Sequence, residues 1–313
     1  MKYILKKLVS LIIILLIVSL LAFLAFQIIP ADPTTKLLGT EATPERIAQL
    51  REALGFNRPF LVRYADWLKS FLTGDFGSSY SYSMPVKDMI ADKFPITITL
   101  TAISFVLITV FSIPLGIFLA KHEGTWFDRI FTTLNQTIMS IPAFFIGIVL
   151  SYIFSVILKV FVHGDFVSYT QDPVAFIKYL FFPAVSIAIP RIAMTVKLLR
   201  SSILAEMNKD YVRTAYSRGN GRDSVLYRHV LKNSLVPVIT FLAVTIADIV
   251  AGSIIIEQVF AIPGLGRLLV KSIFNRDFPV VQAIVVILAI IVVVVNTLAD
   301  IINQYIDPRI KLR

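Results

Sequence analysis

The sequence predicts an all-α protein that crosses a membrane six times. A helical segment follows the first crossing, and a polar elbow lies between the fourth and fifth. The 313 residues are 57% hydrophobic and 16% charged, with a mean hydropathy of +0.79, whereas a soluble domain is about 45–50% apolar and about 25% charged. A soluble core of this length could not bury so much apolar surface, so we expect lipid to be the solvent.

Six stretches reach the roughly 20 apolar residues that a membrane helix needs. The first is too long for the apolar core of a cleaved signal peptide, so we expect an uncleaved anchor helix. We therefore divide the chain into an anchor helix at 1–30, an outer segment at 31–95 and a five-helix core at 96–313. The six stretches cover residues 8–29, 96–120, 131–158, 176–199, 235–256 and 280–306.

The distribution of basic residues predicts the orientation. With both ends inside, the short inner segments and their edges carry sixteen lysines and arginines, and the short outer segments carry five. Such an excess marks the cytoplasmic side, so we expect both termini to be cytoplasmic. The formal charge of +10 then reflects this face and not binding of nucleic acid. The chain has no cysteine and three scattered histidines, and we predict neither a metal site nor a catalytic one.

The outer segment 31–95 carries helix signals. Thr43-Pro44-Glu45 supplies an N-cap, a proline at the first helical position and an acid in the first turn. A second helix is expected from about Pro59 to Gly74, with one apolar stripe, and a third over 85–94. The stripe consists of Leu61, Tyr64, Leu68 and Phe71.

The polar loop 200–234 predicts a helix–turn–helix elbow below the bilayer. We expect a helix over 206–218, a turn over 219–222, and a second helix from Asp223. Gly219 permits a sharp turn, and the small Ala215 allows a partner to approach closely. The basic residues are suited to pairing with an acidic groove; they are Arg213, Arg218, Arg222 and Arg228.

This loop resembles a known motif. Residues 210–219 read DYVRTAYSRG, and after nine further residues 229–237 read HVLKNSLVP. The pattern is similar to the "EAA" loop of ABC importer permeases, in the form found in the dipeptide/oligopeptide/nickel branch. Further segments match that branch in order, including Pro30-Ala-Asp32-Pro33, Gly74-Asp75-Phe76-Gly77, Glu257 to Gly266, Arg276-Asp277-Phe-Pro279 and Asp307-Pro308-Arg309.

The resemblance implies a permease subunit in the cytoplasmic membrane of a bacterium or archaeon. Its partners would be a homologous second permease, two ATPases that use ATP and Mg, and an extracytoplasmic binding protein that delivers di- or oligopeptides. The chain has no phosphate-binding P-loop of its own, so we expect no ATPase site and no cofactor. The residues expected to couple to the ATPase are Glu206, Asp210, Arg213, Thr214, Ala215, Gly219, Arg222 and His229.

Charges inside the apolar stretches leave two interpretations open. Arg191 and Asp248 could line the translocation path, or they could pair across helices for structural reasons. Nickel or a metal chelate remains an alternative cargo within the same branch. More remote alternatives are an ion-coupled secondary transporter using Asp248 and Asp300, which would leave the elbow unexplained, and an intramembrane hydrolase, for which no nucleophile motif exists.

Overall fold

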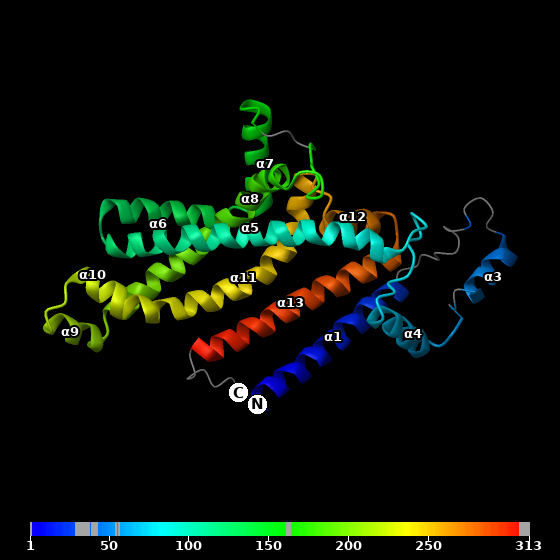
Figure 1. The fold of residues 1–313 in the computed structure, drawn as a ribbon, viewed down its shortest axis with the longest axis horizontal. Coiled ribbons are helices and arrows are strands. Elements are labelled where there is room, and N and C mark those ends of the chain that lie inside the picture. Colours follow the sequence, from blue (N-terminus) through cyan, green and yellow to red (C-terminus); the bar gives the residue numbers. More distant parts are fainter. Residues whose placement is uncertain are drawn as a thin grey trace. The chain divides into compact units, whose positions relative to one another are not determined.

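The computed structural model describes residues 2–28, 38, 43–53, 55, 57–160 and 164–306. Over these residues the chain is built from helices and contains no named strand (Figure 1). Two π-helical turns, Tyr152–Ile157 and Leu226–Val230, interrupt the α-helices. The α-helices are α1 (Lys2–Ile28), α3 (Pro44–Ala53), α4 (Phe60–Leu72), α5 (Val86–Lys121), α6 (Trp126–Met139), α7 (Ala143–Ser151), α8 (Pro173–Met207), α9 (Asp210–Ser217), α10 (Arg222–Val225), α11 (Leu231–Val259), α12 (Leu265–Phe274) and α13 (Phe278–Ile306).

The predicted all-α polytopic fold is confirmed. Within the described residues, five helical runs are long and apolar enough to cross a membrane: α1, α5, α8, the run Arg222–Val259 that ends in α11, and α13. The pair α6 and α7 makes a sixth when it is counted as one span. These are the six stretches that the hydropathy predicts.

The third stretch differs from the sequence prediction. We expected one helix over 131–158, but α6 and α7 meet at an angle of 98°. Pro142 has the extended backbone of an N-cap, with ψ at 141°. A proline disfavours the helical conformation of the residue before it and has no N–H to donate, so α6 ends at Met139 and a new helix begins.

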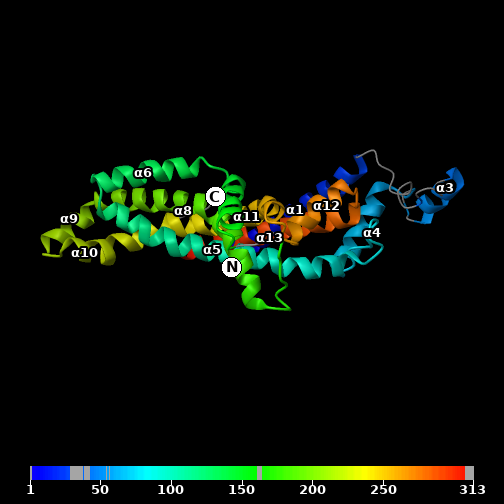
Figure 2. The same cartoon turned by 90° about the horizontal axis from the view of Figure 1, so that it is seen from above.

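The chain divides into two compact units, of which one comprises residues 97–262 and 294–313. In it, α8 packs against α6, α7 and α11 (Figure 2). A Cβ atom at Gly116 would lie 2.8 Å from a methyl carbon of Leu199, so the glycine lets α5 approach α8 closely. The α5–α6 turn and the α9–α10 elbow lie at the same end of this unit (Figures 1 and 2).

The other unit comprises residues 1–96 and 263–293. Here α3 begins as predicted, because the backbone N–H of Arg46 donates to Thr43 Oγ1 at 3.4 Å. The third outer helix, expected over 85–94, is instead the first part of α5. The helix continues through Pro95, and the burial of Ile90 and Ile96 on either side offsets the hydrogen bond that proline cannot make.

The second outer helix, α4, has the predicted limits, but its packed stripe matches the predicted one only at Tyr64 and Phe71. Its packed residues are Phe60, Tyr64, Trp67 and Phe71, and the first three surround Phe23 of α1 with ring centroids 5.5–5.6 Å away. The sequence prediction placed Leu61 on the packed side, but Leu61 is 71% exposed. The predicted and packed stripes share Tyr64 and Phe71. At the other two positions they differ by one residue, and apolar spacing alone does not distinguish these alternatives.

Candidate functional site

The elbow begins with a break that the sequence prediction missed. We expected one helix over 206–218, but α8 ends at Met207 and α9 starts at Asp210. Lys209 between them has an extended backbone, with ψ at 153°. The side-chain amide of Asn208 donates to the carbonyl of Leu204 at 3.0 Å, which satisfies one of the last acceptors of α8. The break makes α9 a separate short helix.

The two faces of α9 differ in chemistry. Val212 and Ala215 are buried, and α9 packs through this side against the residues that open the next helix. Ala215 therefore lies on the packed face. The other face is polar and exposed to solvent, with Asp210 and Arg213 paired at 3.7 Å on its surface. The apolar side of α9 thus anchors the helix, and its charged groups face solvent.

A polar cluster holds α9 against the end of α8. Glu206 accepts hydrogen bonds from Lys209 and from the hydroxyl of Tyr211, the latter at 2.6 Å. The amide of Asn233, in α11, donates to the same hydroxyl at 3.3 Å. Burial and the hydrogen bond to Glu206 both raise the pKa of Tyr211. Glu206, a predicted coupling residue, therefore positions α9 by contacts within the chain.

The turn of the elbow depends on Gly219. Its φ of +81° lies in the left-handed region, which glycine adopts at no steric cost. The side-chain amide of Asn220 closes the turn by donating to the carbonyl of Ala215 at 3.0 Å. The remaining predicted coupling residues Thr214 and His229 are exposed.

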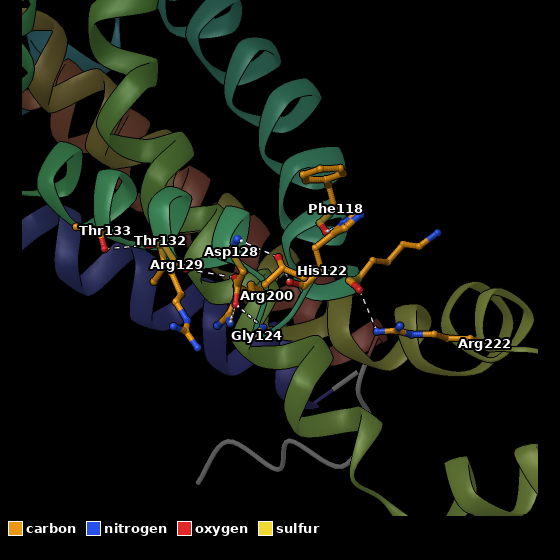
Figure 3. Close-up of polar contacts among 11 residues, drawn as sticks. Phe118, His122, Gly124, Asp128, Arg129, Thr132, Thr133, Arg200 and Arg222 are labelled. Atoms are coloured by element: carbon orange, nitrogen blue, oxygen red, sulfur yellow. Dashed lines mark hydrogen bonds and ion pairs between the residues drawn. The ribbon is translucent and has the colours of Figure 1, made fainter.

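The elbow is also linked to the turn between α5 and α6. Arg222 donates to the carbonyl of Lys121 at 2.9 Å (Figure 3), and the ammonium of Lys121 lies 2.8 Å from Asp223. An open cavity of about 680 Å³ lies between the α5–α6 turn and the elbow, and it is lined by Lys121, His122, Glu123, Thr125 and residues 221–224. Lys121 and Asp223 are partly exposed, so we expect added salt to weaken their ion pair.

A buried ion pair behind this turn is the main feature that sequence reasoning missed. Arg200 of α8 donates from Nε and Nη2 to the two carboxylate oxygens of Asp128 in α6, at 2.8 and 2.7 Å (Figure 3). Asp128 is 4% exposed and also accepts from the N–H of Gly124 at 3.1 Å. In the sequence, Asp128 lies three residues after Thr125, and this pattern indicates only an acidic residue in the first turn of a helix. Nothing in the pattern pairs it with an arginine 72 residues away.

A second ion pair lies within the membrane-spanning helices. The guanidinium of Arg191 in α8 is 2.9 Å from the carboxylate of Asp248 in α11. The structure thus brings together the two charges that the sequence singled out. Their side chains are 28% and 46% exposed, so the pair is not enclosed in the packed interior.

A fully buried carboxylate organises the outer segment in the other unit. Asp277, just before α13, accepts hydrogen bonds from the hydroxyl of Ser79 at 2.5 Å and from the backbone N–H of Tyr80 at 2.9 Å. Burial is the main cause that raises the pKa of Tyr80, and the nearby negative charge of Asp277 raises it further. These contacts join two of the motifs matched in the sequence, Gly74–Gly77 with its continuation and Arg276–Pro279.

Comparison with known proteins covers almost the whole chain. Residues 112–312 match the family described as binding-protein-dependent transport system inner membrane component, and residues 1–101 match the N-terminal region of such components. The oligopeptide transport system permease protein of Bacillus subtilis is 36% identical over 99% of each chain. A putative peptide transport system permease protein of Brucella abortus is 36% identical over 98% of each chain. The dipeptide transport system permease protein of Alkalihalophilus pseudofirmus is 30% identical over 99% of each.

The matches agree with the helices described above, which make the chain a multi-pass inner membrane protein. The Arg191–Asp248 pair and the elbow both lie in the part that matches the main family. Members of the matched family are the membrane components of transporters, not the ATPase subunits, and they work with ATPase and substrate-binding partners. The chain belongs to this family of binding-protein-dependent transport system inner membrane components.

Proposed function

We propose that this chain is a permease subunit of an ABC importer for di- or oligopeptides. The observation that carries the proposal is the likeness, over 98% or more of the chain, to proteins named for peptide, oligopeptide and dipeptide transport. A nickel or metal-chelate cargo is not favoured, because the relatives reported above are named for peptides. The chain supplies the path, and the energy comes from ATP and Mg at separate ATPase subunits.

The proposed assembly contains a second, homologous permease, two ATPases and an extracytoplasmic binding protein. The elbow supports this proposal because α9 exposes Asp210 and Arg213 and is held rigidly by the Glu206 cluster. Rigid anchoring is what a helix needs if movement of an ATPase is to reach the spans. Both termini and the elbow are then cytoplasmic, in agreement with the excess of basic residues on that side.

The test is uptake by a strain that lacks its own peptide importers and carries the chain together with its partner subunits. We expect accumulation of labelled peptides that stops when ATP is depleted, and no accumulation of nickel. The tagged chain, solubilised and purified, should bring a second permease and two P-loop ATPases with it. Uptake that persists without ATP, or a chain that purifies alone, would contradict the proposal.

We further propose that Arg191 and Asp248 line the path. Ionised side chains within membrane spans face a bundle interior or a water-filled cavity, and this pair is partly exposed. Asp248→Asn removes a charge-assisted hydrogen bond of about 1.5–3 kcal/mol, so we expect the uptake rate to fall roughly tenfold or more. Asp248→Glu should restore part of it. Peptide uptake in cells, normalised to the amount of transporter, is the measurement.

The matched control is Asp300→Asn, which removes a carboxylate from another apolar helix, α13. We expect this variant to retain uptake. Unchanged uptake in Asp248→Asn at normal expression would assign the pair a structural role. A large loss in Asp300→Asn, with ATP-independent uptake in the parent, would instead favour a secondary transporter.

A further inference from the structure

Helix α4 is amphipathic in a way that its packing against α1 does not fully explain. Phe60, Tyr64, Trp67 and Phe71 form its packed stripe. A second apolar stripe runs beside it, in which Leu61 and Leu72 are 71% and 77% exposed. The members of this second stripe are Leu61, Ala65, Leu68 and Leu72, at the same i, i+4, i+7, i+11 spacing. An exposed apolar row of this kind marks a contact surface.

The position of α4 along α1 gives its depth in the membrane. The apolar span of α1 runs over Lys6–Ala25. Phe23, which α4 surrounds, is two residues from the end of that span, or roughly 3 Å along a helix. The hydroxyl of Tyr64 reaches further, to Ser19 Oγ at 2.8 Å and to the carbonyl of Leu16 at 3.3 Å. Ser19 is six residues, or roughly 9 Å, inside the end of the span.

The rest of the α4 surface fits the same depth. The side of α1 that is turned away from this contact is apolar and exposed, for example at Ile17 and Leu21, as expected for a helix that crosses a membrane. Leu61 directly follows Phe60, which packs on Phe23, so the second stripe of α4 begins at the same depth along α1. The side of α4 away from this stripe carries the polar residues Asp66, Lys69 and Ser70, with Val62 as the exposed apolar residue among them.

We propose that α4 is an interfacial helix that lies at the membrane surface, with Leu61, Leu68 and Leu72 inserted among the acyl chains of the leaflet at the C-terminal end of α1. With the predicted orientation, this is the extracytoplasmic leaflet. In-plane helices of this type bury their apolar side about 5–10 Å into the boundary between headgroups and acyl chains, which is the depth at which α4 meets α1. The outer segment is thereby held to the lipid surface as well as to α1.

Site-directed spin labelling tests this proposal directly, because the chain has no native cysteine. Nitroxides are attached to Leu61→Cys and Leu72→Cys in the full chain, purified with its partner subunits and placed in phosphatidylethanolamine–phosphatidylglycerol vesicles. Asp66→Cys, on the polar side of the same helix, is the aqueous control. Leu21→Cys, on the exposed side of α1, is the lipid control. Collision with molecular oxygen reports lipid, and collision with a water-soluble nickel chelate reports water.

We expect the labels at Leu61 and Leu72 to have oxygen-to-nickel collision ratios several-fold above that at Asp66 and below that at Leu21. Ratios equal to that at Asp66 would place the stripe in water and overturn the proposal. Suppressed collision with both reagents at Leu61 and Leu72 would show that a protein partner covers the stripe, which would overturn it equally. Neither result depends on the identity of the transported substrate.

Discussion

Replacing Gly219 by valine is expected to reduce transport roughly tenfold or more while the membrane spans remain folded. Gly219 has a φ of +81° and no other atom within 4 Å of the position of a Cβ. Valine therefore meets no steric obstacle from its neighbours, but a β-branched residue is strained in this conformation by about 1–3 kcal/mol. Relief of that strain changes the turn and moves α9. A change of about 1.4 kcal/mol corresponds to tenfold in rate.

The measurements are peptide uptake and substrate-stimulated ATP hydrolysis by the purified assembly. Gly164→Val is the matched control, because Gly164 also has a positive φ, +87°, and open space, but lies outside the elbow. It should retain coupling. Gly219→Asn should be mild, since asparagine tolerates this conformation better than other residues. Normal uptake by Gly219→Val would show that the elbow does not transmit movement.

The sequence alone predicts those features that depend on local pattern. The six apolar stretches, the limits of α4 and the turn at Gly219 all follow from hydropathy, capping residues and glycine. The polar elbow and its relation to known permeases are likewise readable from residues 206–237. The coupling roles of individual elbow residues stay predictions, because they concern contacts with partner chains.

Features that depend on contacts distant in sequence were not predictable. Pro142 alone did not predict the 98° angle between α6 and α7, because a proline in an apolar stretch need not break the helix. Pro183 and Pro190 both lie inside the continuous helix α8. Apolar spacing in α4 allows either Leu61 or Phe60 to lie on the packed side, and the contact with Phe23 of α1 shows that it is Phe60. Asp128 pairs with a residue in another helix, and a sequence pattern holds no information on that pairing.

Loss of the Arg200–Asp128 pair is expected to destabilise the end of α6 and α8 that lies next to the elbow. The pair is bidentate and Asp128 is almost fully buried. Arg200→Gln leaves an uncompensated buried charge, and removing one partner of a buried ion pair costs about 3–5 kcal/mol of folding stability. We expect a clearly lower thermal midpoint of the solubilised protein. Because α8 leads into the elbow, uptake should fall with it.

A double-mutant cycle measures the interaction free energy between Asp128 and Arg200, apart from the effect that each substitution has by itself. Asp128→Asn with Arg200→Gln leaves no buried charge, so the double variant should be less destabilised than the sum of the single variants. The exposed pair Arg58–Asp66 supplies the control, since its side chains are 65% and 60% exposed and pairs of that kind contribute about 0–1 kcal/mol. If Arg200→Gln lowers the thermal midpoint no more than Arg58→Gln does, the pair does not hold α6 to α8. A larger loss that the double variant partly recovers identifies the pair as the contact that holds α6 to α8.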